Sequence, residues 1–160
     1  MKRVLVLLIF LSVSFIIFAA PVTVVYLDRS EINLEAGSYI KKQAKSNKLP
    51  HKFIFASKFS ALKGDEKVVV ILNSGRSSGT DPRIAAYLDT IQPKQSVILV
   101  NLYSIGKNTM MGSIKSADST YGVDEISAAT QWEDKDAAIQ TMHKQWTAEL
   151  FRLIEIRQAL

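Results

Sequence analysis

Two apolar segments, close together in the sequence, limit what this chain can fold into. Val68–Leu72 is a run of five aliphatic residues, and Ser96–Leu102 contains a second run of the same kind. Runs of this length, rich in Val and Ile and bounded by turn residues, are typical of strands buried on both faces. Between them, Asp81–Ile91 has a helical pattern. Parallel strands joined by a helix form a βαβ unit with a right-handed crossover, so the sequence predicts a parallel sheet at the centre of the fold.

The rest of the chain continues this alternation of strands and helices. The further elements that we expect are strands at Val22–Leu27, Lys52–Ala56 and Gly122–Ala128 and helices at Leu34–Asn47 and Trp132–Ala159. Tyr103–Tyr121 is polar, rich in Gly and Ser and without a period, so we expect a long loop there. This order of elements predicts an α/β domain.

The first twenty residues form a targeting segment. Lys2 and Arg3 precede an apolar stretch that runs to Ala20 and is interrupted by two serines. A basic start followed by an apolar stretch is the layout of a Sec signal peptide, which predicts a periplasmic, secreted or membrane-anchored protein. Cleavage after Ala20 and retention, with membrane association through residues 4–20, both remain open. Residues 21–160 suffice for one domain.

Composition and charge exclude several classes of function. The chain has no cysteine, which rules out disulfides, thiolate metal sites and cysteine catalysis. The formal net charge is +5, but Lys and Arg form no basic stripe, so we expect no nucleic-acid partner. His51 and His143 are far apart in the sequence and suggest neither a metal site nor a triad. We expect His143 to flank the core, and we assign no catalytic and no metal-ligating residue.

Three consecutive segments resemble the flavodoxin family. KVVVILNSG (67–75), DPRIAAYLDTI (81–91) and KQSVILVNLY (94–103) are similar to its third strand, third helix and fourth strand, with Tyr87 and Leu88 where the family carries an aromatic residue and a leucine. The resemblance covers residues 22–160 as a pattern. It implies a flavodoxin-like three-layer sandwich with a five-stranded parallel sheet in the order 2-1-3-4-5. It also implies a crevice at the carboxyl ends of strands one and three, FMN as cofactor, and electron transfer to a redox partner.

The predicted crevice suggests a set of FMN contacts. The loop after the third strand contains two glycines, three serines and one arginine before Pro82: Ser74, Gly75, Arg76, Ser77, Ser78, Gly79 and Thr80. Such a loop at a helix N-terminus favours an anion, although a plain connection with a helix capped by Thr80 or Asp81 also fits. Arg29 and Ser30 follow the first strand as phosphate candidates. Tyr103 follows the fourth strand, where the resemblance implies a contact with the flavin ring.

A second resemblance concerns Asp124–Thr130, which reads DEISAAT. It is similar to the D-x-x-S-G-A-T motif of FMN-binding domains in membrane redox complexes of the Rnf and sodium-pumping quinone reductase type. That resemblance implies that Thr130 carries FMN through a phosphoester formed by a flavin transferase. The segment Thr130–Glu133 also fits a capping box for the last helix, and both interpretations remain open.

The segment where flavodoxins bind the FMN phosphate differs here from the family pattern. Residues 28–35 contain no glycine and carry Asp28, Glu31 and Glu35, which repel a phosphate. Two functions therefore remain open. The first is an exported FMN-binding electron-transfer module. The second is a cofactor-free envelope protein that uses the crevice, or the 103–121 loop, to bind a protein partner or a small ligand.

Overall fold

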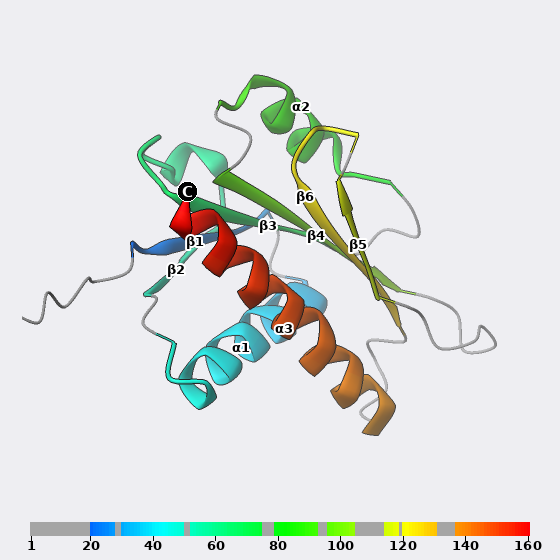
Figure 1. Cartoon of the computed structure of the whole chain (residues 1–160). Helices are drawn as coiled ribbons and strands as arrows, with labels where there is room; N and C mark the ends of the chain where they lie inside the picture. Colours follow the sequence, from blue (N-terminus) through cyan, green and yellow to red (C-terminus); the bar gives the residue numbers. More distant parts are fainter. Residues whose placement is uncertain are drawn as a thin grey trace, which may run out of the picture.

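A six-stranded sheet in the order β2-β1-β3-β4-β6-β5 forms the centre of the fold (Figure 1). The computed structural model describes residues 20–27, 30–49, 52–74, 79–92, 96–104, 114–118, 120–130 and 137–160. The strands are β1 (Val22–Tyr26), β2 (Phe53–Ala56), β3 (Val68–Ser74), β4 (Val97–Ser104), β5 (Ile114–Asp118) and β6 (Asp124–Thr130). The helices are α1 (Glu31–Ser46), α2 (Pro82–Thr90) and α3 (Ala137–Ala159), with a 3-10 turn, η1, at Phe59–Ala61.

The predicted parallel sheet is confirmed. β1 pairs in parallel with β2 and β3, β3 pairs with β4, and β4 pairs with β6. β6 is the fifth of the parallel strands in sequence, so these five strands have the order 2-1-3-4-5 of a flavodoxin-like fold. The two apolar segments form its centre, where Val70 of β3 lies between Val24 of β1 and Ile98 of β4.

β5 is an additional strand, within a segment that the sequence analysis expected to be a loop. It pairs antiparallel with β6 at the edge of the sheet. Neighbouring parallel strands such as β4 and β6 need a connection that returns along the sheet, and this is usually a helix. Here β5 provides part of that return as a strand. Residues 105–113 and 119 lie outside the described residues.

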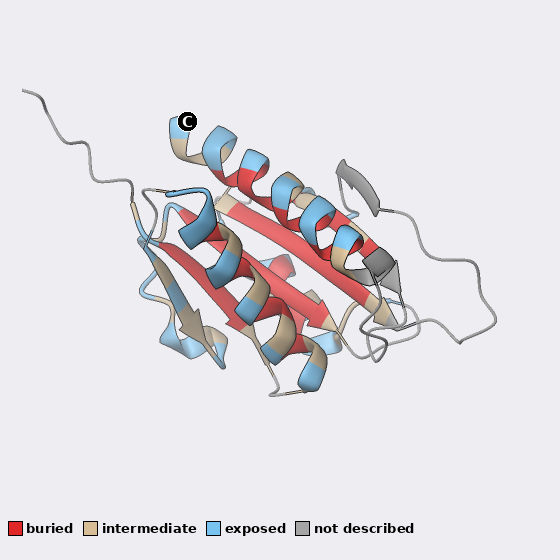
Figure 2. Ribbon diagram, turned by 90° about the horizontal axis from the view of Figure 1, so that it is seen from below, coloured by how far each residue is buried: buried red, intermediate tan, exposed pale blue. Residues whose placement is uncertain are grey.

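Helices cover both faces of the sheet and complete the predicted three-layer sandwich. α1 and α3 lie side by side on one face and α2 lies on the other (Figures 1 and 2). Alternate residues of each strand face different layers, as the pleat requires. Val68 and Val70 pack with α1 and α3, whereas Val69 and Ile71 pack with α2. Each helix therefore buries one stripe against the sheet.

Local chemistry explains where α1 and α2 begin. Ser30 is the N-cap of α1, and Asp81 is the N-cap of α2, whose first residue is Pro82. Proline suits this position because the first N–H of a helix has no partner within the helix. In the last helix, Trp146 and Leu150 are fully buried at the predicted helical spacing.

His143 is a core residue, so the prediction that it flanks the core is wrong. Its imidazole is fully buried and stacks on Tyr39 of α1 with 3.9 Å between ring centroids and 5° between planes. Nδ1 accepts a hydrogen bond from Nε1 of Trp146 at 3.2 Å. Burial penalises the charged form and lowers the pKa of His143 to about 4. The residue therefore joins α1 to α3 as a neutral packing group.

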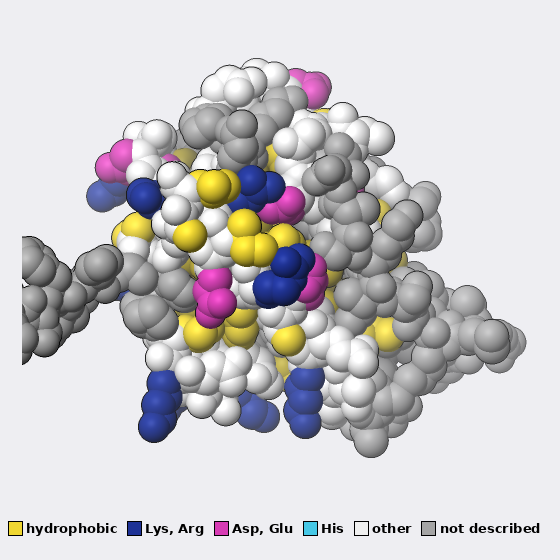
Figure 3. All heavy atoms as spheres, in the orientation of Figure 1, with side chains coloured by type: hydrophobic (Ala, Val, Ile, Leu, Met, Phe, Trp, Pro, Cys, Tyr) yellow, Lys and Arg dark blue, Asp and Glu magenta, His cyan; other side chains and the backbone are white. Residues whose placement is uncertain are grey.

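The described surface carries mixed charge. On the face seen in Figure 3, basic side chains are spread out rather than gathered in one patch. Arg157, near the end of α3, donates to Asp124 at the start of β6 at 2.6 Å and ties the last helix to the sheet. Within the ranges that the structure describes, no helix combines the length and apolar character needed to cross a membrane. Residues 1–19, which make up nearly all of the predicted targeting segment, lie outside those ranges.

Candidate functional site

The predicted crevice lies where the parallel strands end, because carboxyl ends of parallel strands meet at one edge of the sheet. The structure describes five of its predicted residues with their side chains: Ser30, Ser74, Gly79, Thr80 and Tyr103. The predicted contacts Arg29, Gly75, Arg76, Ser77 and Ser78 lie outside the described residues. Thr130 is described only as the last residue of β6, paired with Ser104 at the end of β4.

Two of the predicted residues meet at this edge. The Oγ atoms of Ser30 and Ser74 lie 3.4 Å apart, although 44 positions separate them in the sequence. Ser30 also accepts a hydrogen bond from the backbone N–H of Asn33 at 3.4 Å. The N-terminus of α1 therefore lies beside the end of β3, as a flavodoxin-like crevice requires.

A row of polar side chains crosses the α2 face of the sheet, from Asn73 near the carboxyl end of β3 to Glu125 near the start of β6. Asn73, Asn101 and Ser127 occupy paired positions on β3, β4 and β6. Nδ2 of Asn73 donates to Oδ1 of Asn101 at 2.6 Å. Nδ2 of Asn101 donates to Oε1 of Glu125 at 2.7 Å and to Oγ of Ser127 at 3.4 Å. We call these four residues the polar row. Its two asparagines are 2% and 1% exposed, so the hydrogen bonds are shielded from water.

Asn73 also holds the end of the loop that was predicted to bind an anion. Its Oδ1 accepts from the backbone N–H of Asp81 at 3.1 Å, and its Nδ2 donates to the carbonyl of Gly79 at 3.1 Å. Gly79 has φ +81°, which glycine adopts without strain. Asp81 accepts from the N–H of Arg83 at 2.8 Å, so Asp81 rather than Thr80 is the cap. The described part of the loop thus anchors α2 to the sheet.

Tyr103 joins the opposite end of the polar row. It hydrogen-bonds with Ser127, whose Oγ donates to Oε1 of Glu125 at 2.9 Å. The pKa of Tyr103 is raised, first because the phenol is partly buried and second because Glu125 is close. The phenol is therefore protonated at neutral pH. A carboxylate, a phenol and a hydroxyl meet here, and this arrangement suits a ligand that donates hydrogen bonds or carries positive charge.

The start of α1 does not fit a flavin phosphate. The side chain of Ser30 already serves as the helix cap, and Glu31 adds a negative charge in the first turn. A phosphate dianion at this helix N-terminus would meet that carboxylate at short range, which opposes the attraction of the helix dipole. The charge of Glu125 at the polar row also disfavours an anion.

Tyr103 was predicted as a site residue, whereas Asn101 and Glu125 were not. Asn73 and Asn101 interrupt strands that are otherwise aliphatic, and that interruption is a signal that sequence reasoning could have used. Glu125 gave no such signal, because its contact with Asn101 depends on how β6 pairs with β4. The second predicted helix cap is only partly described. Thr130 ends β6, and residues 131–133 of the proposed capping box lie outside the described residues.

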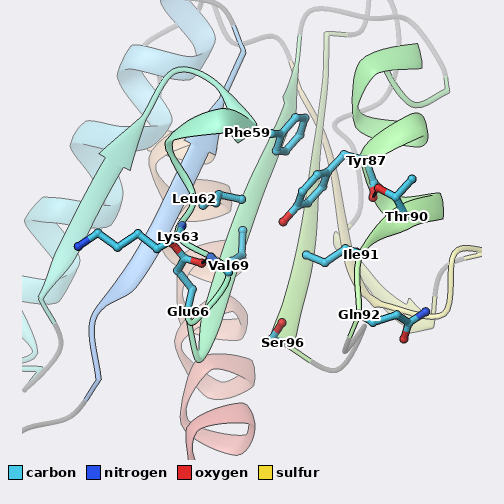
Figure 4. Close-up of a pocket in the computed structure, with 11 residues that line it drawn as sticks. Phe59, Leu62, Lys63, Glu66, Val69, Tyr87, Thr90, Ile91, Gln92 and Ser96 are labelled. Carbon is cyan, nitrogen blue, oxygen red and sulfur yellow. Dashed lines mark hydrogen bonds between the residues drawn. The ribbon is translucent and has the colours of Figure 1, made fainter.

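Cavities occur at the other edge of the sheet, around the connection from η1 to β3. Three of them, of about 430, 480 and 480 Å³, share Glu66 as a lining residue. The first lies between α2 and η1 and is shown in Figure 4. Within the described ranges, no three His, Asp or Glu side chains are grouped so that they could hold a metal ion.

No protein-family model matches this chain, and no curated protein matches its sequence. What the chain shares with flavodoxin-like proteins is therefore a fold, seen in the strand order and the arrangement of the layers.

Proposed function

We propose that this protein is an extracytoplasmic module of the flavodoxin-like fold that binds a small ligand without FMN. The observation that carries the proposal is the polar row with Tyr103 beside it, which reaches from β3 to Glu125 near the start of β6. Asn73 and Tyr103 lie toward the edge where α/β sheets of this topology bind ligands. Export is inferred from the signal-like segment at residues 1–20.

The contacts of Glu125 support a ligand that donates hydrogen bonds or is cationic. Asn101 and Ser127 both donate to Oε1 of Glu125, and neither of them donates to Oε2. The carboxylate is thus held in one orientation by neighbours whose own positions are fixed. A preorganised acceptor of this kind loses little conformational entropy when a ligand binds. Tyr103 adds a partly buried phenol at the same place.

A second candidate is the FMN-binding electron-transfer module that acts with a redox partner protein. It is favoured by the strand order and by the position of Tyr103 at the end of β4. In that case the flavin would supply the redox chemistry, and the chain would bind and orient it. The poor fit of the start of α1 to a phosphate makes this the weaker candidate.

A visible spectrum separates the two candidates. The protein is expressed from the full chain with export intact and a flavin transferase present. We expect a colourless protein that takes up no added FMN. A flavin band that denaturation releases would instead support noncovalent FMN, and a band that survives denaturation would support attachment at Thr130.

Binding at the polar row is tested with methylguanidinium, a small planar cation that matches a carboxylate. We expect it to shift the NMR amide signals of Asn101 and Glu125. Glu125→Gln keeps the acceptor oxygen for Asn101 but removes the charge, and it should weaken binding roughly three- to fivefold. The matched control is Glu155→Gln, which removes an exposed carboxylate of α3 on the other face of the sheet. Equal effects of the two variants, or shifts centred elsewhere, would contradict the proposed ligand site.

A further inference from the structure

A cavity of about 430 Å³ lies between α2 and the connection from η1 to β3 (Figure 4). Its apolar lining includes Leu62, Val69, Ile91 and the ring pair Phe59–Tyr87. The two rings stack with 4.0 Å between centroids and 6° between planes. The rest of the lining is polar and includes Thr90, Gln92 and Ser96. The volume falls within the range of small-molecule sites, which span roughly 300–1,000 Å³.

This cavity is separate from the polar row. Val69 is the second residue of β3, and Ser96 directly precedes β4, so the lining belongs to the amino-terminal ends of the central strands. Asn73 and Asn101 lie further along the same two strands. An occupant of the cavity would therefore leave the polar row free.

One carboxylate is held at the side of the cavity. Oε1 of Glu66 accepts from the backbone N–H of Lys63 at 2.6 Å, and Oε2 accepts from the N–H of Gly64 at 2.9 Å. Gly64 has φ +84°, so the turn that presents both N–H groups depends on glycine. A carboxylate has about four acceptor sites, so Glu66 can still accept hydrogen bonds from a bound molecule.

The polar side chains of the cavity make its interior favourable for a cation. Figure 4 shows the hydroxyl of Tyr87 pointing into the cavity and the ammonium of Lys63 pointing away from it. The pKa of Tyr87 is raised to about 12, first because the phenol is buried and second because Glu66 is close. The described lining therefore presents a phenol that is protonated at neutral pH and the carboxylate of Glu66, beside both apolar and uncharged polar side chains.

We propose that this cavity binds a small molecule with a flat apolar body and a protonated amine. The amine lies at Glu66, and the apolar body fills the space between Leu62, Ile91 and the ring of Tyr87. The carboxylate selects the charge of the ligand, and the apolar side chains on one part of the lining select its body. This site is independent of the function proposed for the polar row.

Three related probes test the inference on protein expressed from the full chain. Phenethylamine carries an aromatic ring and an ammonium, 2-phenylethanol is its neutral counterpart, and 3-phenylpropionate is an anionic one. Binding is followed by NMR amide signals, and we expect the largest shifts at Lys63, Gly64 and Tyr87. The amine should bind roughly three- to fivefold more tightly than the alcohol, and the acid more weakly than both.

Variants of two neighbouring acids complete the test. Glu66→Gln should weaken phenethylamine roughly three- to fivefold and leave 2-phenylethanol unchanged. Asp65→Asn is the matched control, because Asp65 is exposed, carries the same charge and does not line this cavity. If Glu66→Gln perturbs the fold, the comparison of the three probes on the unaltered protein still tests the inference. Equal affinity for amine and acid, equal effects of the two variants, or shifts centred on Asn101 would each overturn the inference.

Discussion

Acidification should destabilise this protein through His143. The imidazole is fully buried between α1 and α3, and its pKa in the folded state is about 4, below the ordinary value of 6.5. Between these two values the unfolded chain binds a proton that the folded chain does not. The contribution of His143 to stability is therefore fully present above pH 6.5 and is lost as the pH falls through that window.

The size of the effect follows from the two pKa values. Each tenfold change in proton affinity corresponds to about 1.4 kcal/mol. The fall in the pKa of His143 from 6.5 to about 4 therefore lowers the free energy of unfolding by about 3 kcal/mol once the imidazole is protonated in both the folded and the unfolded state. Over the narrower range from pH 7.5 to pH 5, the expected loss is about 2 kcal/mol. This is a large share of the stability of a single domain, commonly about 5–15 kcal/mol.

The assay is urea unfolding at pH 7.5, 6 and 5, followed by tryptophan fluorescence. His143→Gln is the comparison, because glutamine can accept the hydrogen bond from Trp146 but does not titrate in this range. The variant starts from a lower stability, since stacking on Tyr39 is altered, and only the dependence on pH is compared. The unaltered protein should lose about 2 kcal/mol more than the variant between pH 7.5 and 5. His51 is present in both proteins and cancels.

An equal pH dependence in both proteins would refute this reasoning. It would mean that the folded state accepts the proton at His143 as readily as the unfolded chain does. Glu35 is the group that could cause this, because its Oε1 lies 3.9 Å from Nε2 of His143. Glu35→Gln would then restore the acid sensitivity. In the arrangement described, burial outweighs that carboxylate, and the pKa of His143 is lowered.

Three further variants test the packing and the polar row. Asn73→Ala removes the acceptor of the Asp81 N–H and the donor to Oδ1 of Asn101, and it should cost about 1–3 kcal/mol in urea unfolding, unlike the exposed control Asn47→Ala. Arg157→Met removes the partly buried pair with Asp124 and should lower the melting temperature measurably, whereas Arg152→Met, in an exposed pair, should not. Leu150→Ala opens a cavity under α3 and should cost about 2–5 kcal/mol, measured by calorimetry; a cost below 1 kcal/mol would contradict the packing.

The central sheet could be predicted because its strands carry their own signal. β3 and β4 are buried on both faces, and burial on both faces requires an uninterrupted aliphatic run that is visible without knowledge of the partners. β5 carries no such signal. Its sequence IKSAD is mostly polar, and its backbone pairs with a single neighbour at the sheet edge. An edge strand of this kind forms because of the strand it pairs with, so its own residues do not predict it.

The position of His143 could not be predicted for a related reason. One histidine beside an apolar stripe is compatible with either the core or the surface. What decides is the aromatic ring that faces it, and Tyr39 lies 104 positions earlier in the sequence, on α1. Only the packing of α1 against α3 brings the two rings together. The hydrogen bond from Trp146, one turn further along α3, stabilises the neutral imidazole.

The polar row shows how the register of the sheet fixes the candidate site. Ile126 and Ala128 of β6 are buried against α1 and α3, and alternation then turns Glu125 and Ser127 to the other face. A slip of one residue would place the carboxylate of Glu125 in the apolar core, which is costly without a partner there. The apolar residues of β6 therefore fix the register, and the register places Glu125 within 2.7 Å of Asn101. The packing that stabilises the sheet thus also positions the side chains proposed to bind a ligand.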